Sequence, residues 1–387
     1  MSCFYVLRPV RDALGTQYPL QWLFLGTFLS VLALLPLHAY ALSRWPRQRF
    51  VPLILGAFAV LMVLFHALLA QKAAPAWVGI AFFIFVAVFV VYGVSLLWAL
   101  LADVYSPTAA RQDYGYIAAG ATSGALLGPP LSLLLVPLLG VPAMLLVAAG
   151  LLTLGIFAAL KVARSSGGEA TAAVGGGLWE GARLVRSQPV LWGLLLLVFF
   201  NSGAGTLLYN VQVDVARQLY PDLAQRATYF ARIDLAINVG ALLLQFLVAR
   251  WLLTRYGSGP AMLIPTLLMA MSFVVLAASP LPAMVALAQI AQRGSAFGLL
   301  QPGRESLYPG QSRMARYKAK TFIDVIVFRG ADVVFVWAHQ ALVLLGAGIP
   351  GIAMAGLLLT LGMGFGAWRA ARAAQSPATA KVELPAP

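Results

Sequence analysis

Long apolar runs recur from one end of this chain to the other, and short loops marked by Pro, Gly or Arg separate them. A helix that crosses a membrane needs about 20 consecutive, mostly apolar residues. Eleven of the runs reach this length. The pattern therefore predicts eleven full membrane spans, over residues 18–42, 51–69, 76–101, 117–136, 143–163, 190–211, 229–253, 259–277, 282–303, 321–345 and 349–368.

The composition agrees with this pattern. Hydrophobic residues make up 61% of the chain and charged residues only 10%, whereas soluble domains contain about 25% charged residues. We therefore predict an all-α integral membrane protein that crosses the bilayer many times, with lipid as its first partner.

Lys and Arg gather in one alternate set of predicted loops, whereas the opposite set holds only Lys72, Arg217 and Arg226. Cytoplasmic loops carry the excess of positive charge, so we expect the first set and the C-terminus to be cytoplasmic. This bias, together with contact with anionic lipid headgroups, explains most of the formal net charge of +14. The charge therefore does not indicate a nucleic-acid partner.

The longest polar interruption is KVARSSGGEATAAVGGGLWEGARLVRSQPV, near the middle of the chain. Its Gly-rich, basic composition predicts a cytoplasmic linker over 164–189. The linker divides an N-terminal transmembrane half, 1–163, from a C-terminal half of six spans, 190–368, and a cytoplasmic tail follows at 369–387. Transporters are commonly built from two such halves, and we expect a monomer because both halves lie in one chain.

A shorter apolar segment, MSCFYVLRPVRDALG, precedes the five full spans of the N-terminal half. The predicted orientation makes this segment the outer part of a helix that began in the cytoplasm, yet only seven residues precede Arg8. We expect a truncated first helix, either because translation starts upstream or because the beginning was lost. With this helix, the predicted number of spans becomes six in each half of the chain.

Charged residues are rare inside membranes because each costs roughly 2.5–3.5 kcal/mol on insertion scales, so they usually face a cavity or a partner. The stretch KAKTFIDVIVFRGADVVFVW carries Lys320, Asp324, Arg329 and Asp332 within one half of the helix surface. One interpretation places them together in a solute cavity. The other makes Asp324, Arg329 and Asp332 structural ion pairs.

Two further helices carry polar residues at depths that normally hold apolar ones. In YFARIDLAINVGALLLQFL, Asp234, Asn238 and Gln245 lie within about 40° of one another around the axis. They can contact a solute or form interhelical hydrogen bonds, whereas Arg232 lies near the outer end and is expected to reach the interface. Asn201 is central in LLLLVFFNSGAGTLLYN, close to glycines that permit a bend or close helix contact.

Arg293 lies near the centre of the predicted span 282–303, about ten residues from either end. At 1.5 Å per residue this position is near the bilayer midplane, out of reach of either interface. Gln289 and Gln292 share its face of the helix. We therefore expect Arg293 to face a cavity.

Four stretches resemble one known family: YVLRPVRDALG, LLWALLADVYSPTAARQDYGYIAAGATSGALLGP, ARIDLAINV and YKAKTFIDVIVFRGAD. They are similar to the ATP/ADP translocases, which exchange nucleotides in plastids and intracellular bacteria, and particularly to shorter bacterial relatives. The resemblance implies a fold of the major facilitator superfamily and a bacterial inner membrane location. Arg8, Arg11 and Asp12 match the motif of the first helix, and Lys320 and Asp324 match that of the eleventh.

We therefore predict a secondary transporter for an anionic solute such as a nucleotide, working by alternating access as an antiporter. Arg binds phosphate or carboxylate in bidentate fashion and keeps its charge at any working pH, and an empty cationic cavity would resist reorientation. The predicted solute-binding residues are Arg8, Arg11, Asp12, Asn201, Asp234, Asn238, Gln289, Arg293, Lys320, Asp324 and Arg329.

Alternatives stay open because acids in the spans nearly balance the arginines. The acids can titrate and couple transport to protons, and the solute can be another organic molecule or a lysolipid. A third possibility is a membrane scaffold that transports nothing. We predict no enzyme, cofactor or metal, since the sequence brings no acid and histidine constellation into a loop and His38, His66 and His339 lack metal-ligand spacing.

Overall fold

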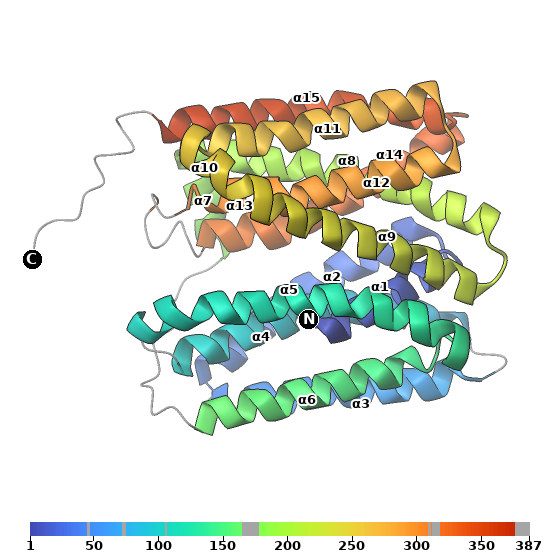
Figure 1. The fold of residues 1–387 in the computed structure, drawn as a ribbon, viewed down its shortest axis with the longest axis vertical. Helices are drawn as coiled ribbons and strands as arrows, with labels where there is room; N and C mark the ends of the chain where they lie inside the picture. Colours follow the sequence, from blue (N-terminus) through green and yellow to red (C-terminus); the bar gives the residue numbers. More distant parts are fainter. Residues whose placement is uncertain are drawn as a thin grey trace, which may run out of the picture. The chain divides into compact units, whose positions relative to one another are not determined.

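The structure is a computed structural model that describes residues 1–44, 47–71, 75–104, 107–164, 178–308, 311 and 318–375. Within these ranges it contains helices and no strand (Figure 1). The helices are α1 Ser2–Gly15, α2 Leu20–Arg44, α3 Arg47–Leu69, α4 Ala76–Val104, α5 Pro107–Leu139, α6 Met144–Arg164, α7 Leu178–Ser187, α8 Pro189–Leu219, α9 Leu223–Leu244, α10 Arg250–Tyr256, α11 Ser258–Ala278, α12 Pro282–Ser295, α13 Gln301–Glu305, α14 Phe328–Leu344 and α15 Ile349–Ala374. Three π-helical segments connect some of them: η1 Gln245–Ala249, η2 Ala296–Leu300 and η4 Phe322–Val327.

All eleven predicted spans coincide with helices. By length and apolar composition, nine helical stretches among the described residues can cross a membrane. The two predicted spans outside these nine are 282–303 and 321–345, which are helical but interrupted by η2 and η4. They are also the spans that carry Arg293 and the Asp324–Asp332 charges, as expected of helices whose polar face is turned away from lipid.

The described chain packs into two compact units. Unit 1 comprises Met1–Ala173 and Ala216–Leu235, and unit 2 comprises Val174–Val215 and Ala236–Pro387. The end of α8 and the start of α9 therefore belong to unit 1. The predicted boundaries of the two halves, at residues 163 and 190, stay a prediction.

In unit 1, α1 is a short helix that packs against α4, α5 and α6, while α3 runs beside α6 (Figure 1). The apolar side chains Val6, Leu7 and Val10 of α1 are fully buried. Gly128 of α5 lies directly against Tyr5, so that a Cβ at this position would collide with α1. The close approach buries α1 on several sides, and with it the charged residues that α1 carries.

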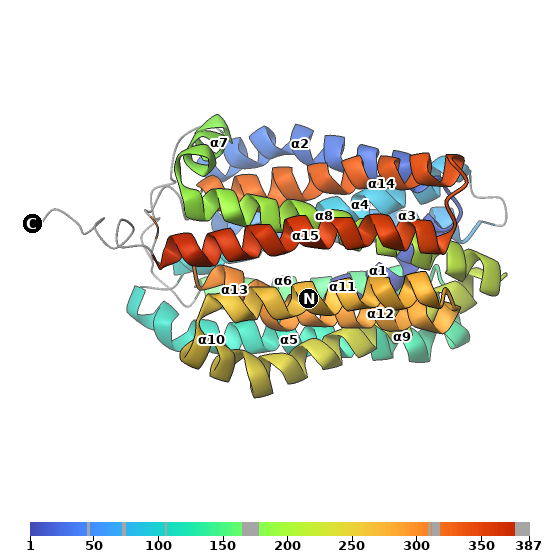
Figure 2. The ribbon, with the colours of Figure 1, turned by 90° about the horizontal axis from the view of Figure 1, so that it is seen from above.

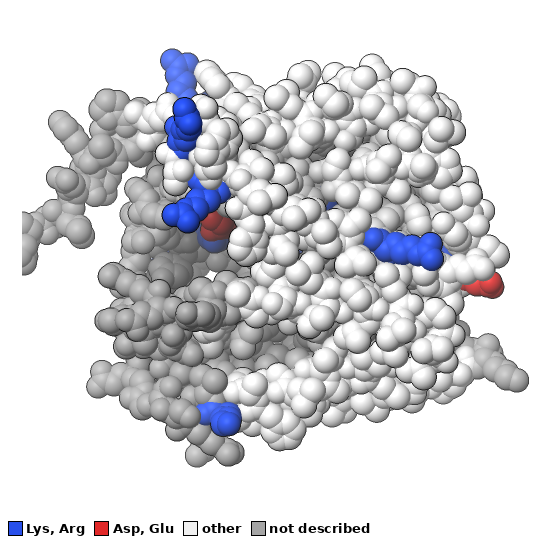
Figure 3. Space-filling model, viewed as in Figure 1, with Lys and Arg blue, Asp and Glu red and all other residues white. Residues whose placement is uncertain are grey.

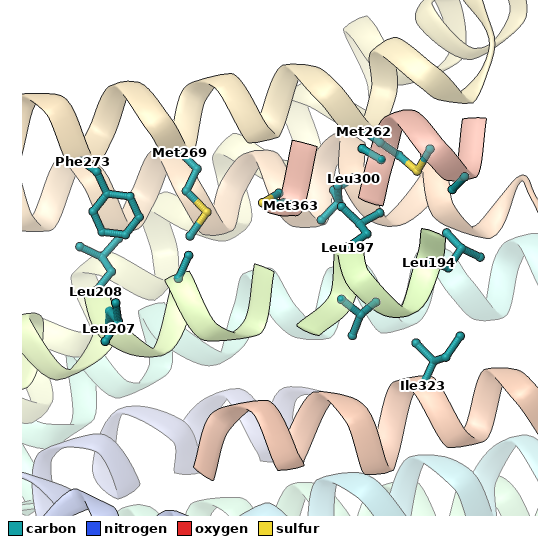
Figure 4. Close-up of a cluster of buried hydrophobic side chains, with 14 of the residues drawn as sticks. Leu194, Leu197, Leu207, Leu208, Met262, Met269, Phe273, Leu300, Ile323 and Met363 are labelled. Carbon is teal, nitrogen blue, oxygen red and sulfur yellow. The ribbon is translucent and has the colours of Figure 1, made fainter. Parts of the chain in front are cut away.

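In unit 2, α11 and α15 run side by side, and α8 lies beside α14 (Figure 2). The core combines Leu197 of α8, Met262 and Phe273 of α11 and Met363 of α15 (Figure 4). A Cβ on Gly366 of α15 would be 2.5 Å from the backbone nitrogen of Leu197. Small residues thus let the helices approach closely, as is common in membrane bundles.

The surface is dominated by uncharged residues. Figure 3 shows one face on which Lys, Arg, Asp and Glu atoms cover only small areas of the described residues. Large apolar side chains are exposed among the described residues, for example Phe246 at 78% and Leu361 at 69%. Such surfaces mark contact with lipid or another apolar partner, which agrees with a multi-pass membrane protein.

Candidate functional site

A cluster of four charged side chains joins α1 to α9 within unit 1. Arg8 and Asp12 lie one turn apart on α1, and Asp234 comes from α9. The Nε atom of Arg8 is 3.5 Å from Oδ2 of Asp234 and 3.9 Å from Oδ2 of Asp12. All three residues are buried, at 8%, 1% and 2% exposure for Arg8, Asp12 and Asp234.

Arg11 completes the cluster from the same helix. Its Nη2 and Nε atoms donate hydrogen bonds of 2.6 and 3.0 Å to Oδ1 of Asp12, and its guanidinium lies 5.0 Å from the ring centre of Phe83. Two arginines and two aspartates thus balance each other in charge. The structure brings together Arg8, Arg11, Asp12 and Asp234, four of the predicted residues, although the pairing of Arg8 with Asp234 could not be read from the sequence.

Two arginines, one in the last turn of α8 and one near the start of α9, contact the residue that follows α1. Arg217 donates from Nε to the carbonyl oxygen of Thr16 at 2.7 Å, and Arg226 donates from Nη1 to the Thr16 hydroxyl at 2.7 Å. Thr16 is 1% exposed. These contacts hold the helix that carries Arg8 in place. The only signal for them in the sequence was the rarity of basic residues in the region between the two predicted spans.

The polar residues predicted to share one face of the span 229–253, which are Asp234, Asn238 and Gln245, have different neighbours in the structure. Asp234 faces α1, Asn238 is buried one turn further along, and Gln245 donates from Nε2 to the carbonyl oxygen of Phe297 at 3.0 Å. The Gln245 contact is an interhelical hydrogen bond, one of the two roles expected for this stripe. Arg232 is exposed, as expected, although α9 begins at Leu223 and Arg232 therefore lies inside the helix and not near its end.

A second buried cluster in unit 2 surrounds Asp332 of α14. Its Oδ1 atom accepts hydrogen bonds from the hydroxyls of Ser202, at 2.6 Å, and Thr206, at 2.9 Å, both on α8. Its Oδ2 atom is 3.3 Å from Nη1 of Arg329, three residues earlier on α14. Single hydroxyl residues in an apolar run carry little signal, so Ser202 and Thr206 were not expected here.

The four charges predicted to share one face of the span 321–345 form two separate groups. Asp324 pairs with Arg304 at 2.6 Å, not with Arg329. Lys320 pairs with Glu305 at 2.5 Å. The four charges are therefore not gathered at one point: Lys320 and Asp324 contact the end of α13, while Asp332 contacts α8 and pairs with Arg329. The Arg329–Asp332 contact is of the kind expected for a structural ion pair, the second interpretation given above, and a role of these residues in solute binding stays a prediction.

The first of these groups continues into a network of ion pairs. Arg304 also lies 3.4 Å from Glu305, the Lys320 ammonium is 5.2 Å from the ring centre of Tyr308, and Lys318 pairs with Glu180 of α7. Burial raises the pKa of the Tyr308 hydroxyl, and Asp324 adds to the shift. Tyr308 therefore stays neutral beside these charges.

Buried amides form a third feature of unit 2. Gln289 and Gln292 of α12 are 1% and 6% exposed, and Gln212 of α8 is 1% exposed. The Oε1 atoms of all three have no hydrogen-bond partner among the described residues, and the same holds for Oδ1 of Asn201. Buried polar atoms normally have a partner in protein or ordered water, so these amides have unused capacity to bind.

The placement of the amides along α8 supports this view. Asn201 and Gln212 fall on one side of α8 at 100° per residue, and Gly205 between them would bring a Cβ within 3.4 Å of Nε2 of Gln292. Arg293, next to Gln292, is half-buried. Gln292 of α12 thus approaches the stretch of α8 that carries Asn201 and Gln212, and polar groups of two helices come near each other within unit 2.

Buried charges between apolar helices are typical of a multi-pass membrane protein with a polar interior. Comparison with known protein families and structures identifies the class of this protein. Residues 2–312 match the profile of the Major Facilitator Superfamily. The chain therefore belongs to this family, and it is a transporter and not an enzyme. A comparison with curated protein sequences gave no match.

Among solved structures, one similar fold is that of a bacterial homologue of the human lysosomal transporter Spinster, in an inward-facing, unoccupied conformation. The two chains are 15% identical and align with a TM-score of 0.58, over 96% of this chain and 94% of the other. The predicted superfamily fold is thereby confirmed. The narrower resemblance to the ATP/ADP translocases finds no support in these comparisons.

Proposed function

We propose that this chain is a secondary transporter that carries a small organic anion across the membrane by alternating access. The observation that carries the proposal is the state of Arg8. Its side chain is buried, and it has two ion-pair neighbours at 3.5 and 3.9 Å but no hydrogen bond among the described residues. A guanidinium has five N–H donors in a planar fork that suits phosphate and carboxylate.

The neighbours of Arg8 explain why its N–H donors can bind a solute. Asp12 already accepts hydrogen bonds of 2.6 and 3.0 Å from Arg11, so its attraction is shared between two arginines. An arriving anion can take the donors of Arg8 without breaking a hydrogen bond. Arg11 keeps Asp12 neutralised while this happens.

The same cluster bears on whether transport is an exchange. An uncompensated cationic cavity would oppose reorientation when empty, but Asp12 and Asp234 compensate Arg8 within unit 1. The empty carrier therefore faces no large charge penalty from this cluster. We propose that exchange is possible but not obligatory.

The resemblance of the N-terminal motif and of residues 317–332 to the ATP/ADP translocases makes ATP and ADP the first anions to test. A second candidate is a zwitterionic or neutral organic solute, including a lysolipid. The balanced charges around Arg8 and the buried amides Gln289 and Gln292 favour it, because such groups can bind without a net charge on the solute.

The experiment is uptake into liposomes that contain the purified protein. Labelled ATP is offered with and without ADP inside, followed by other phosphate, carboxylate, zwitterionic and neutral solutes. The variant Arg8→Gln is compared with Arg232→Gln, which removes an exposed arginine from α9. Anion uptake that is lost in Arg8→Gln and kept in Arg232→Gln supports the proposal, whereas transport of neutral solutes only, unchanged in Arg8→Gln, refutes it.

A further inference from the structure

We propose that one end of unit 2, formed by α10, the start of α11 and the last turns of α15, binds the headgroup of an anionic membrane lipid. The site is centred on Arg369 and Arg372 of α15. It lies on helices that carry none of the residues assigned above to the solute, so the proposal is independent of the transport function.

Three helices reach this end of unit 2. The last residue of α10 is Tyr256 and the first of α11 is Ser258, so a single residue joins the two helices. A Cβ on Gly259 of α11 would lie 3.5 Å from the Cβ of Ala371 in α15. The end of α10, the start of α11 and the last turns of α15 therefore lie together, at an end of the molecule where Figure 3 shows Lys and Arg atoms gathered.

The outer face of α15 is an apolar stripe that ends in an arginine. Leu361, Phe365, Trp368 and Arg372 are all exposed and fall within about 60° of one another around the helix. The rings of Phe365 and Trp368 are 5.9 Å apart, and the guanidinium carbon of Arg372 is 5.2 Å from the ring centre of Trp368. Apolar residues, then Trp, then Arg follow the order of acyl chains, interface and headgroups in a bilayer. This order places Arg372 at the level of the lipid phosphates.

The positive charge at this end has no compensation from the protein. The helices α10, α11 and α15 contain no Asp or Glu but four arginines, which are Arg250, Arg255, Arg369 and Arg372. Among the described residues, none of the four pairs with a carboxylate. By contrast, Arg304, Lys318 and Lys320 of the neighbouring segments each pair with one. An anion from outside the chain is therefore the complement that this surface lacks.

Arg369 supplies hydrogen-bond donors that the protein does not use. Its side chain is half-buried, and the Nε atom is buried with no hydrogen-bond partner among the described residues. Rotation of this side chain toward the surface would present its N–H groups to an anion without breaking a hydrogen bond. Arg372 is three residues further along the helix, so the two guanidinium groups are surface neighbours. One phosphate group has enough oxygens to accept from both.

A lipid fits this surface better than a free anion does. A free phosphate would use the arginines and leave the stripe of Leu361, Phe365 and Trp368 exposed to water. A lipid uses both parts, because its acyl chains cover the stripe while its phosphate reaches Arg369 and Arg372. The lipid should carry a net negative charge, since a zwitterionic headgroup brings its own cation to helices that have no acidic residue to receive it.

The experiment measures lipid binding to the purified protein. Native mass spectra are recorded while phosphatidylglycerol or phosphatidylcholine with the same acyl chains is added to the protein in detergent. We expect the wild type to bind phosphatidylglycerol more tightly. The double variant Arg369→Gln/Arg372→Gln should lower this affinity about 25-fold, at roughly fivefold for each arginine near a membrane surface, and should leave the affinity for phosphatidylcholine unchanged.

The matched control is Arg183→Gln/Arg186→Gln. It also removes two arginines that lie three residues apart, and both are exposed on α7. The net charge changes by the same amount, yet the affinity for phosphatidylglycerol should be kept. The unfolding midpoint of each variant checks that it is folded, which we expect because the exchanged side chains make no hydrogen bond that helix packing needs.

A competition arm separates the lipid from a free anion. Glycerol 3-phosphate carries the phosphate group without acyl chains and should not displace phosphatidylglycerol. If it does so in the wild type, the site takes a soluble anion and the lipid assignment is wrong.

Two further outcomes would overturn the proposal. Equal affinity of the wild type for the two lipids would mean that the arginines do not select a charged headgroup. An equal loss in the two double variants would mean that binding follows net charge and not a site. None of these measurements involves transport, so a failure of the proposed function is recognised separately in the liposome uptake experiment.

Discussion

Replacement of Arg8 by Gln gives the sharpest test of the α1 cluster. The substitution removes the guanidinium but keeps a polar side chain of similar length. If Arg8 binds the solute, the loss is that of a charge-assisted hydrogen bond, worth about 1.5–3 kcal/mol. Since about 1.4 kcal/mol corresponds to a tenfold change in a binding constant, the apparent KM for the anion should rise roughly 10- to 150-fold.

The same substitution affects folding in a way that can be separated from transport. Removal of one partner from a buried ion pair costs about 3–5 kcal/mol, and the separations of 3.5 and 3.9 Å to the two carboxylates place Arg8 at the lower end of that range. Asp234→Asn should restore most of the stability in the double variant, because it removes a carboxylate that Arg8 had compensated. It should not restore anion affinity.

The assays are liposome uptake for KM and the unfolding midpoint of the detergent-solubilised protein for stability. Arg8→Lys provides an intermediate, since Lys keeps the charge but loses the planar fork. A normal KM in Arg8→Gln, at normal amounts of protein in the membrane, would refute the assignment of Arg8 to the solute. A normal unfolding midpoint would refute the energetic reasoning about the pair.

Three further predictions concern packing, the ion-pair network and the amides. Gly203→Ala should destabilise the protein by about 1–3 kcal/mol and lower its unfolding midpoint, because the new Cβ would collide with the Phe335 ring. Gly240→Ala should be tolerated, since no atom lies within 4 Å of a Cβ at that position. Equal midpoints for the two variants would contradict the packing. Arg304→Gln should destabilise the protein by breaking its 2.6 Å pair with Asp324, and a second change, Asp324→Asn, should recover part of the loss in the same unfolding assay. Gln289→Leu should leave stability unchanged or increased, since its Oε1 has no partner among the described residues, but should reduce solute uptake; unaltered uptake would assign Gln289 no role in binding.

The ion-pair network around Arg304 allows the effect of buried and of more exposed charges on stability to be compared within one protein. It links α13, the segment before η4 and α7, and it includes two side chains that are more exposed than those around Arg8: Lys320 and Glu305 are 36% and 35% exposed. Exposed ion pairs contribute little to stability. We therefore expect variants of Lys320 to change stability less than variants of Arg304, whose side chain is 14% exposed.

The sequence by itself determined the helices. In lipid each backbone N–H and C=O must be satisfied within the protein, so an apolar run of spanning length has no alternative to a helix, and all eleven predicted spans are helical. It also identified the charged side chains that the described part of the structure buries and some of the buried amides, because a charge or amide at mid-span depth needs a polar neighbour. Asp234 and Gln289 were found this way, whereas Arg8 and Asp12 were assigned by the resemblance of their motif to a known family.

Tertiary structure alone decided which residues are partners. Helical periodicity predicts the face on which a side chain lies but not the helix that the face meets, and the choice of neighbour depends on close contacts such as Gly128 against Tyr5. For this reason Asp324 pairs with Arg304 across a connection instead of with Arg329 on its own helical stretch, and Asp332 finds Ser202 and Thr206 on α8. The sequence supplied the charges, and helix packing distributed them into separate clusters. Substitutions in each cluster can therefore be tested separately for their effects on transport and stability.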